Sequence, residues 1–145
     1  MKHALEGGAM KDLVERLEAG ETGREMDAEI ARAFGLAMPI PFHHPNAADP
    51  QHQYYVTPSR NAHRDLMQDP PNLTGSHYLA DRLFNDEINP WGSGKDWTVT
   101  EKADTFCKVE IYQRTAGEPL TLCSGIGATP AAALIAALLR AKDAP

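Results

Sequence analysis

The sequence predicts an α+β fold in which a small antiparallel three-stranded sheet packs with four or five helices in a layered sandwich. Three segments near the C-terminus are rich in β-branched and aromatic residues and are separated by turn-forming stretches. Apolar residues at helical spacing precede these segments, and an alanine- and leucine-rich run follows them. Because a chain of 145 residues that is 42% hydrophobic can bury one core, we expect a single domain over residues 1–145.

The N-terminal third predicts two short helices. Residues 1–9 show no periodic pattern and are expected to be a loose leader, whereas apolar residues recur at helical spacing over residues 10–19. Thr22 and Glu25 have the spacing of a capping box, which predicts the start of a second helix that ends at Gly35. Two helices joined so tightly are expected to form an αα-hairpin or an L-shaped corner.

The middle of the chain changes composition twice. Residues 36–53 contain four prolines and predict a long loop, and residues 72–96 are the second irregular region. We expect both to be surface insertions. Residues 54–56 predict a short strand or a packing clamp, and Pro58 opens an expected helix that runs to about Met67 with Ala62 and Leu66 inward. Within the second region, the spacing of apolar residues favours a helix from about Ser76 to Asn85.

The three strand segments predict an antiparallel meander over residues 97–100, 105–113 and 120–124. Cys107, Val109 and Ile111 alternate with polar residues, as do Leu120 and Leu122. Burying this whole set on one face places Val109 opposite Leu122 and Ile111 opposite Leu120.

The same register gives a prediction for the two cysteines. Cys107 then lies opposite Ser124 and points inward, while Cys123 points to the other face. Because a disulfide needs Cα atoms within about 7 Å and converging Cβ vectors, we expect two free thiols. Cys107 is expected to be the less reactive, since the apolar face shields it.

The last element is the predicted core helix. Thr129 is a good N-cap, Pro130 fits the first helical position, and Arg140 and Lys142 lie at the negative end of the helix dipole. The large apolar side chains share one face, while alanines cover much of the remainder: Leu134, Ile135, Leu138 and Leu139. We expect this helix to pack across the sheet.

Four stretches along the chain carry a family resemblance: Leu17-Glu18-Ala19 with residues 25–31, Thr57-x-Ser59-x-x-Ala62-x-x-x-Leu66, Trp97 at the start of a strand, and residues 128–134 running into Leu139-Arg140-Ala141. They resemble the small phage and prophage proteins of the phage α-β-α (ABA) sandwich domain family. The chain departs from that pattern at Asn61 and His63, where the family usually has an acidic residue and an alanine. The resemblance implies the fold and a phage or prophage origin, and it carries over no catalytic residues.

Charge and hydropathy exclude several classes of protein. A net charge of −6 argues against a broad grip on nucleic acid or on an anionic membrane. No run approaches the ~20 apolar residues that span a bilayer, and the N-terminus lacks the pattern of a secretory signal. Two cysteines without CxxC spacing fit a reducing compartment. We therefore expect a protein of the host-cell cytoplasm.

A histidine-rich loop is the candidate metal ligand set. His43, His44 and His52 lie in one loop with Asp49 between them, and imidazole and carboxylate are ligands of zinc and nickel. Their spacing matches no standard motif, and long loops fix ligands poorly. We predict a solvated loop, no metal site and no cofactor, with metal binding by this loop as the less favoured alternative.

Two histidines lie near acidic residues in the sequence. His63 is close to Asp65 and His77 to Asp81, and a histidine oriented by a carboxylate is the usual proton-transfer unit. No nucleophile is placed beside either pair. We interpret these residues as exposed positions on helices and expect that the protein is not an enzyme.

The glycine-containing stretch before the last helix is the candidate anion site. Gly125, Gly127 and Thr129 lie where a strand is expected to turn into a helix, and backbone N–H groups at such a turn can hold an anion. The stretch lacks the lysine and third glycine of familiar nucleotide loops. It supports the alternative hypothesis of a protein that binds and sequesters a small anion or a nucleotide signal.

Aromatic residues in the irregular regions carry the main functional hypothesis. These residues are of the types that anchor protein interfaces: Phe42, Tyr54, Tyr55, Tyr78 and Trp91. With the acidic balance and the lack of a catalytic motif, they predict a non-enzymatic accessory protein that docks on a host protein. A counter-defence inhibitor of an immune protein such as a CRISPR complex is the specific form of this hypothesis.

Overall fold

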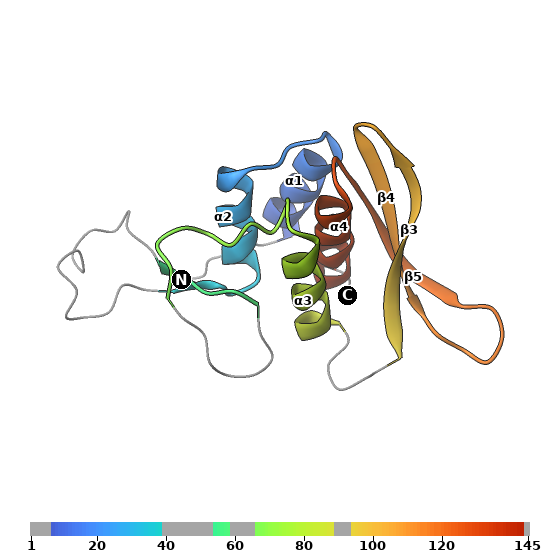
Figure 1. The fold of residues 1–145 in the computed structure, drawn as a ribbon. Coiled ribbons are helices and arrows are strands. Elements are labelled where there is room, and N and C mark those ends of the chain that lie inside the picture. The colour runs from blue at the N-terminus through green and yellow to red at the C-terminus, as the bar shows by residue number, and fades with distance from the viewer. Residues whose placement is uncertain (1–6, 39–53, 59–65, 89–93, 144–145) are drawn as a thin grey trace.

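The computed structural model describes residues 7–38, 54–58, 66–88 and 94–143 as an α+β fold (Figure 1). The described residues form four helices: α1 (Gly7–Glu18), α2 (Arg24–Ala33), α3 (His77–Glu87) and α4 (Pro130–Asp143). Two antiparallel sheets accompany them: β1 (Ala37–Met38) with β2 (Tyr54–Tyr55), and β3 (Lys95–Ala103), β4 (Phe106–Gln113) and β5 (Leu120–Gly127) in the order β3-β4-β5. The predicted α+β class and the three-stranded meander are confirmed. Within these residues, no helix is both long and apolar enough to cross a membrane.

Helix α4 is the centre of the core, as its sequence predicts. It lies between the sheet and helices α1 and α3, and all four helices lie on the same side of the sheet (Figure 1). Every residue from Ala131 to Leu139 is buried. A helix that is apolar on all sides is stable only when every side has a packing partner. The leucine and isoleucine face was expected to be buried, and the alanine face is buried as well.

The alanine face is buried because two glycines of β5 let the helix come close to the strand. A Cβ atom built on Gly125 would lie 2.3 Å from the carbonyl oxygen of Ala133 and 2.3 Å from the nitrogen of Ala137. A Cβ atom on Gly127 would lie 2.6 Å from the nitrogen of Ala133. These glycines therefore belong to a strand and pack under α4, so the predicted turn at this position is wrong.

The register of β4 and β5 also differs from the prediction. Val109 pairs with Gly125 and Ile111 with Cys123, while Leu120 and Leu122 are exposed. The prediction failed because it required the apolar set to face inward, whereas the close approach of α4 admits only small residues from β5. The inward residues of β5 are Cys123, Gly125 and Gly127.

The prediction of two free thiols is confirmed, but its geometric reason is wrong. Cys123 faces the helices, where its Sγ donates to the carbonyl oxygen of Ala137 at 3.5 Å. Cys107 pairs with Gly127, which lies four residues beyond Cys123 in β5. At ~3.3 Å per residue this offset separates the two cysteines by roughly 13 Å, so a disulfide is excluded by distance rather than by face.

The N-terminal helices form as predicted, with different ends. Helix α1 begins at Gly7, within the expected leader. Helix α2 is capped by Gly23 rather than by the predicted capping box, and Thr22 is exposed. The φ angle of Gly23 is 107°, which favours glycine, and its N–H donates to Oγ1 of Thr74 at 3.1 Å. The side chain of Thr74, which is distant in the sequence, therefore accepts a hydrogen bond at the start of α2, where the predicted capping box of Thr22 and Glu25 was expected to act.

Residues 72–88 are part of the core, so the prediction of a surface insertion over 72–96 is wrong for this stretch. Leu73 and Thr74 are buried, and α3 packs Leu83 and Phe84 toward the core beside α4. The predicted helix itself is confirmed, because Ser76 is its N-cap and accepts from the N–H of Leu79 at 3.1 Å. The regular apolar spacing on which the helix prediction rested was therefore also the signal for burial.

The other predictions for the middle of the chain have mixed outcomes. The expected strand at residues 54–56 is confirmed in part as β2, which pairs Tyr55 with Ala37. The expected helix does not reach its predicted end, because Met67 exchanges backbone hydrogen bonds with Tyr55 at 2.7 and 2.8 Å and Leu66 is exposed. Residues 59–65 of that helix, residues 39–53 of the first expected insertion and residues 1–6 of the leader lie outside the described residues.

Candidate functional site

The structure separates the predicted interface residues into four groups. Tyr78 is 64% exposed, as an anchor for a partner must be. Tyr55 is only 8% exposed and belongs to the core, so its assignment as an interface residue is wrong. Tyr54 is half-buried in β2. Phe42 and Trp91 lie outside the described residues.

Tyr78 lies on a small surface that we call the α3–β3 surface: His77, Tyr78, Asp81 and Arg82 of α3 with Trp97 of β3. The guanidinium carbon of Arg82 lies 5.7 Å from the centre of the Tyr78 ring, and its Nη1 donates to the Tyr78 hydroxyl at 3.1 Å. The two residues are one helical turn apart, which is the spacing at which helix side chains meet. The exposed ring is therefore held by a cation–π contact and a hydrogen bond.

Trp97 joins the strand to the helix on the same surface. Its indole Nε1 donates to Oδ1 of Asp81 at 2.7 Å, and its ring lies 5.0 Å from the ring of His77. The other carboxylate oxygen of Asp81 accepts from Nδ2 of Asn85 at 3.3 Å. Both oxygens of Asp81 are thus engaged in structural bonds, which speaks against His77 and Asp81 as an acid–base pair. His63 and Asp65, the other predicted pair, lie outside the described residues.

A buried polar network fixes the start of α3, and it was not predicted from the sequence. Oδ1 of Asp27, which is only 4% exposed, accepts from the N–H and the hydroxyl of Thr74 at 2.8 and 2.9 Å. The Thr129 hydroxyl donates to the carbonyl oxygen of Thr74 at 2.6 Å and accepts from the N–H of Ala132 at 2.9 Å. The beginnings of α2, α3 and α4 are therefore tied together through Thr74.

Burial raises the pKa of Asp27, and hydrogen bonds from Thr74 and Leu73 act in the opposite direction. Desolvation is the larger effect because a carboxylate that leaves water loses strong hydration. One signal in the sequence is an acidic residue between two core positions of a helix, Met26 and Ile30. That pattern alone does not predict that Asp27 is buried, because the hydrogen-bond partner that allows its burial, Thr74, is distant in the sequence.

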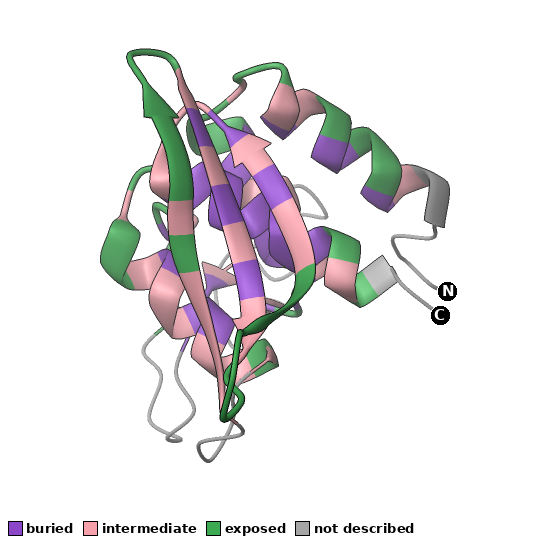
Figure 2. Cartoon of the chain, turned by 90° about the vertical axis from the view of Figure 1, so that its right-hand side faces the viewer, coloured by how far each residue is buried: buried purple, intermediate pink, exposed green. Residues whose placement is uncertain are grey.

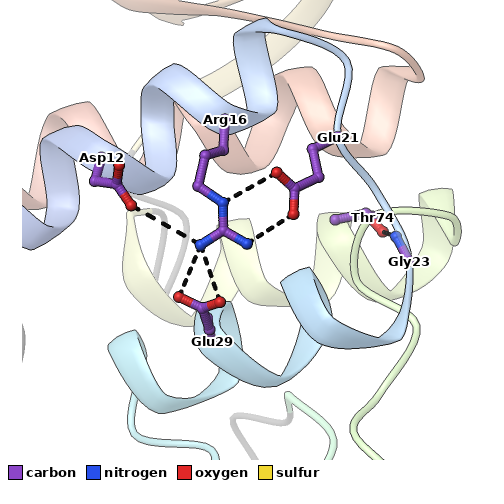
Figure 3. A network of polar contacts seen from close by, with 6 residues as sticks. All are labelled: Asp12, Arg16, Glu21, Gly23, Glu29 and Thr74. Carbon is purple, nitrogen blue, oxygen red and sulfur yellow. Dashed lines mark hydrogen bonds and ion pairs between the residues drawn. The ribbon is translucent and has the colours of Figure 1, made fainter.

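A second polar cluster, around Arg16, connects α1 to α2 (Figure 3). Arg16 binds Glu21 through Nε at 3.0 Å and Nη2 at 2.7 Å, and its Nη1 binds Glu29 at 2.9 Å. Asp12 lies 3.9 Å from the same Nη1. Glu21 and Glu29 raise the pKa of Arg16, and the Arg16 hydrogen bond lowers the pKa of Glu21. We interpret the cluster as a structural contact that holds α1 and α2 together, because the carboxylates of Glu21 and Glu29 are already bound to Arg16.

The predicted anion site has other partners in the structure. Gly125 and Gly127 are buried beneath α4, and Thr129 uses its hydroxyl as both donor and acceptor inside the protein. A ligand at this position would have to displace either the helix or the polar network. The arrangement therefore gives no support to the anion-binding alternative.

Metal binding can be assessed only for part of the candidate ligand set. In the described ranges, no group of three or more histidine, cysteine, aspartate or glutamate residues could hold a metal ion. His43, His44, His52 and Asp49 lie outside those ranges. With the anion site and a metal site unsupported among the described residues, the α3–β3 surface with its exposed Tyr78 ring is the strongest candidate site there.

No protein-family model, curated protein or solved structure matches the chain. The resemblance to the phage sandwich family accordingly stays a prediction. Among the described residues, a functional assignment rests on the geometry of the α3–β3 surface.

Proposed function

We propose that the chain is a non-enzymatic binding module that docks on another protein through the α3–β3 surface. The observation that carries this proposal is an exposed Tyr78 ring held in place by Arg82. Tyrosine, arginine and tryptophan are the residues that most often dominate interface energies. A ring that is already ordered loses little conformational freedom when a partner covers it, which favours binding.

The charge of the chain supports a basic partner. The net charge of −6 attracts a positively charged surface at long range and speeds the encounter. Proteins that hold nucleic acid present such surfaces. In its specific form, the proposal makes the chain a phage or prophage accessory protein of the host cytoplasm that blocks a host immune protein such as a CRISPR complex. The layered-sandwich assignment is part of the same proposal, and the stacking of the helices on one side of the sheet is compatible with it.

The proposal is tested with a partner purified after capture by the parent protein and then titrated against surface variants. Tyr78→Ala is expected to weaken binding about 30-fold, since loss of an interface hot spot costs about 2 kcal/mol. Leu66→Ala is the matched control, because Leu66 is also a large exposed apolar residue and is not part of the α3–β3 surface. Equal affinities for the two variants would contradict the proposal.

A further inference from the structure

The hydroxyl of Tyr78 has one hydrogen-bonding role left for a partner. Its oxygen already accepts from Nη1 of Arg82 at 3.1 Å, and the Arg82 guanidinium carbon lies 5.7 Å from the centre of the ring. The remaining role is that of a donor, through the O–H. Because Tyr78 is 64% exposed, water can accept from this O–H in the free protein.

A protein that covers Tyr78 removes that water. A donor that is buried without an acceptor opposes binding, because it loses its hydrogen bond to water and gains none in return. Tyrosine hydroxyls that become buried accordingly have a hydrogen-bond partner in most structures. A partner that docks on Tyr78 therefore has to place an acceptor opposite the O–H.

The charge of Arg82 selects the kind of acceptor. Its guanidinium lies against the Tyr78 ring, so a partner that covers the ring also takes this cation out of water. A cation that leaves water is stabilised by a nearby anion and destabilised by a second cation. A carboxylate meets both requirements, since it accepts from the O–H and offsets the positive charge.

The acidic residue of the α3–β3 surface does not supply this carboxylate. Oδ1 of Asp81 accepts from Nε1 of Trp97, and its Oδ2 accepts from Nδ2 of Asn85. The surface is also open to an outside group, because β3 is an edge strand in which no residue is buried, in contrast to β4 (Figure 2). The acceptor for Tyr78 is therefore expected to come from the partner.

We propose that the partner presents an aspartate or glutamate carboxylate to the Tyr78 hydroxyl and the Arg82 guanidinium. This inference rests on the docking function proposed above and adds the chemistry of its central contact. The net charge of −6 acts at long range and attracts a basic surface, whereas Tyr78 and Arg82 act only at contact. One acidic side chain within a basic surface fits both observations.

The role of the hydroxyl is tested by isothermal titration calorimetry of the full-length protein with the purified partner protein. Tyr78→Phe keeps the aromatic ring and removes the O–H. It is expected to weaken binding about tenfold, which is less than the loss expected for Tyr78→Ala. Parent-like affinity of Tyr78→Phe beside weak binding of Tyr78→Ala would overturn this inference and leave the docking function standing. Parent-like affinity of both variants would contradict the docking function as well.

The charge of the acceptor is tested with Arg82→Glu. Lys11→Glu is the matched control, because it makes the same exchange of a cation for a carboxylate on α1, outside the α3–β3 surface. Arg82→Glu is expected to weaken binding by about tenfold or more, since it brings two carboxylates together. Lys11→Glu is expected to bind as tightly as the parent or more tightly, because added negative charge favours a basic partner. An affinity of Arg82→Glu equal to or higher than that of the parent would overturn the proposal, because it would place a neutral or cationic group opposite Tyr78.

Discussion

At the scale of single residues, Gly125 sets the distance between the core helix and the sheet. Any side chain at this position meets backbone atoms of Ala133 and Ala137, which cannot rotate away as the end of a flexible side chain can. We predict that Gly125→Ala destabilises the fold by roughly 1–3 kcal/mol through overpacking. The measurement is the free energy of unfolding in urea.

Gly117→Ala is the matched control for this variant, because nothing lies within 4 Å of a Cβ atom built on Gly117. The control is expected to unfold at nearly the same urea concentration as the parent. Identical unfolding of both glycine variants would show that α4 does not lie as close to β5 as described.

Asp27 gives a prediction about pH. Its pKa is raised in the folded state by burial, so its stabilising contribution is complete below the unfolded pKa and is lost as pH rises through the folded pKa. Asp27→Asn removes this titration and leaves the other groups in place. The stability of the parent relative to Asp27→Asn should therefore fall as pH rises from about 4 to about 7. Urea unfolding of both proteins across this range measures the difference, and parallel curves would be incompatible with a raised pKa.

At the scale of elements, α4 is expected to carry much of the stability. Leu138 is 1% exposed, and truncation of a buried leucine leaves a cavity in addition to the lost transfer energy. We predict that Leu138→Ala lowers the free energy of unfolding by ~2–5 kcal/mol. Leu120→Ala serves as the control, since Leu120 is 59% exposed, and it should cost well under half as much. Similar losses in the two variants would argue against a central α4.

Elements with local signals could be predicted from the sequence. The capping threonine, the proline and the apolar face of α4 lie within one stretch, and the strands of the meander are separated by evident turns. Features that depend on distant contacts could not be predicted. The register of β5 depends on how near α4 comes. The N–H of Gly23, the N-cap residue of α2, donates to Thr74, which lies 51 residues away in the sequence.

The candidate site shows the same division. Tyr78 could be predicted from the sequence as an exposed aromatic residue. Its contact with Arg82 becomes evident only once both residues are placed one turn apart on α3. The hydrogen bond between Trp97 and Asp81 becomes evident only once β3 is placed beside α3. Tyr55 was misassigned because an aromatic residue next to a loop has the same sequence signal whether it is exposed or buried. Its burial follows from the pairing of β2 with β1 and from the bridge to Met67.

At the scale of the whole molecule, the small β1–β2 sheet brings Met38 and Tyr54, which flank residues 39–53 in the sequence, next to each other. Met38 pairs with Tyr54, which is the geometry that flanks a two-residue turn, so Asn-Gly can replace these 15 residues. Leu36, Tyr55 and Val56 stay in the core on either side. We predict that this replacement leaves the cooperative thermal transition in place. Loss of that transition in a calorimetric scan would show that residues 39–53 contribute to the core.

The central claim is that the α3–β3 surface is the docking face. Hydrogen–deuterium exchange of the whole protein, measured with and without its purified partner, tests it most directly, because covered backbone amides exchange more slowly. The account predicts that the partner slows exchange in peptides spanning residues 77–82 and 95–99 and leaves residues 7–18 of α1 unchanged. Protection confined to α1, or to residues 120–127 of β5, would contradict it.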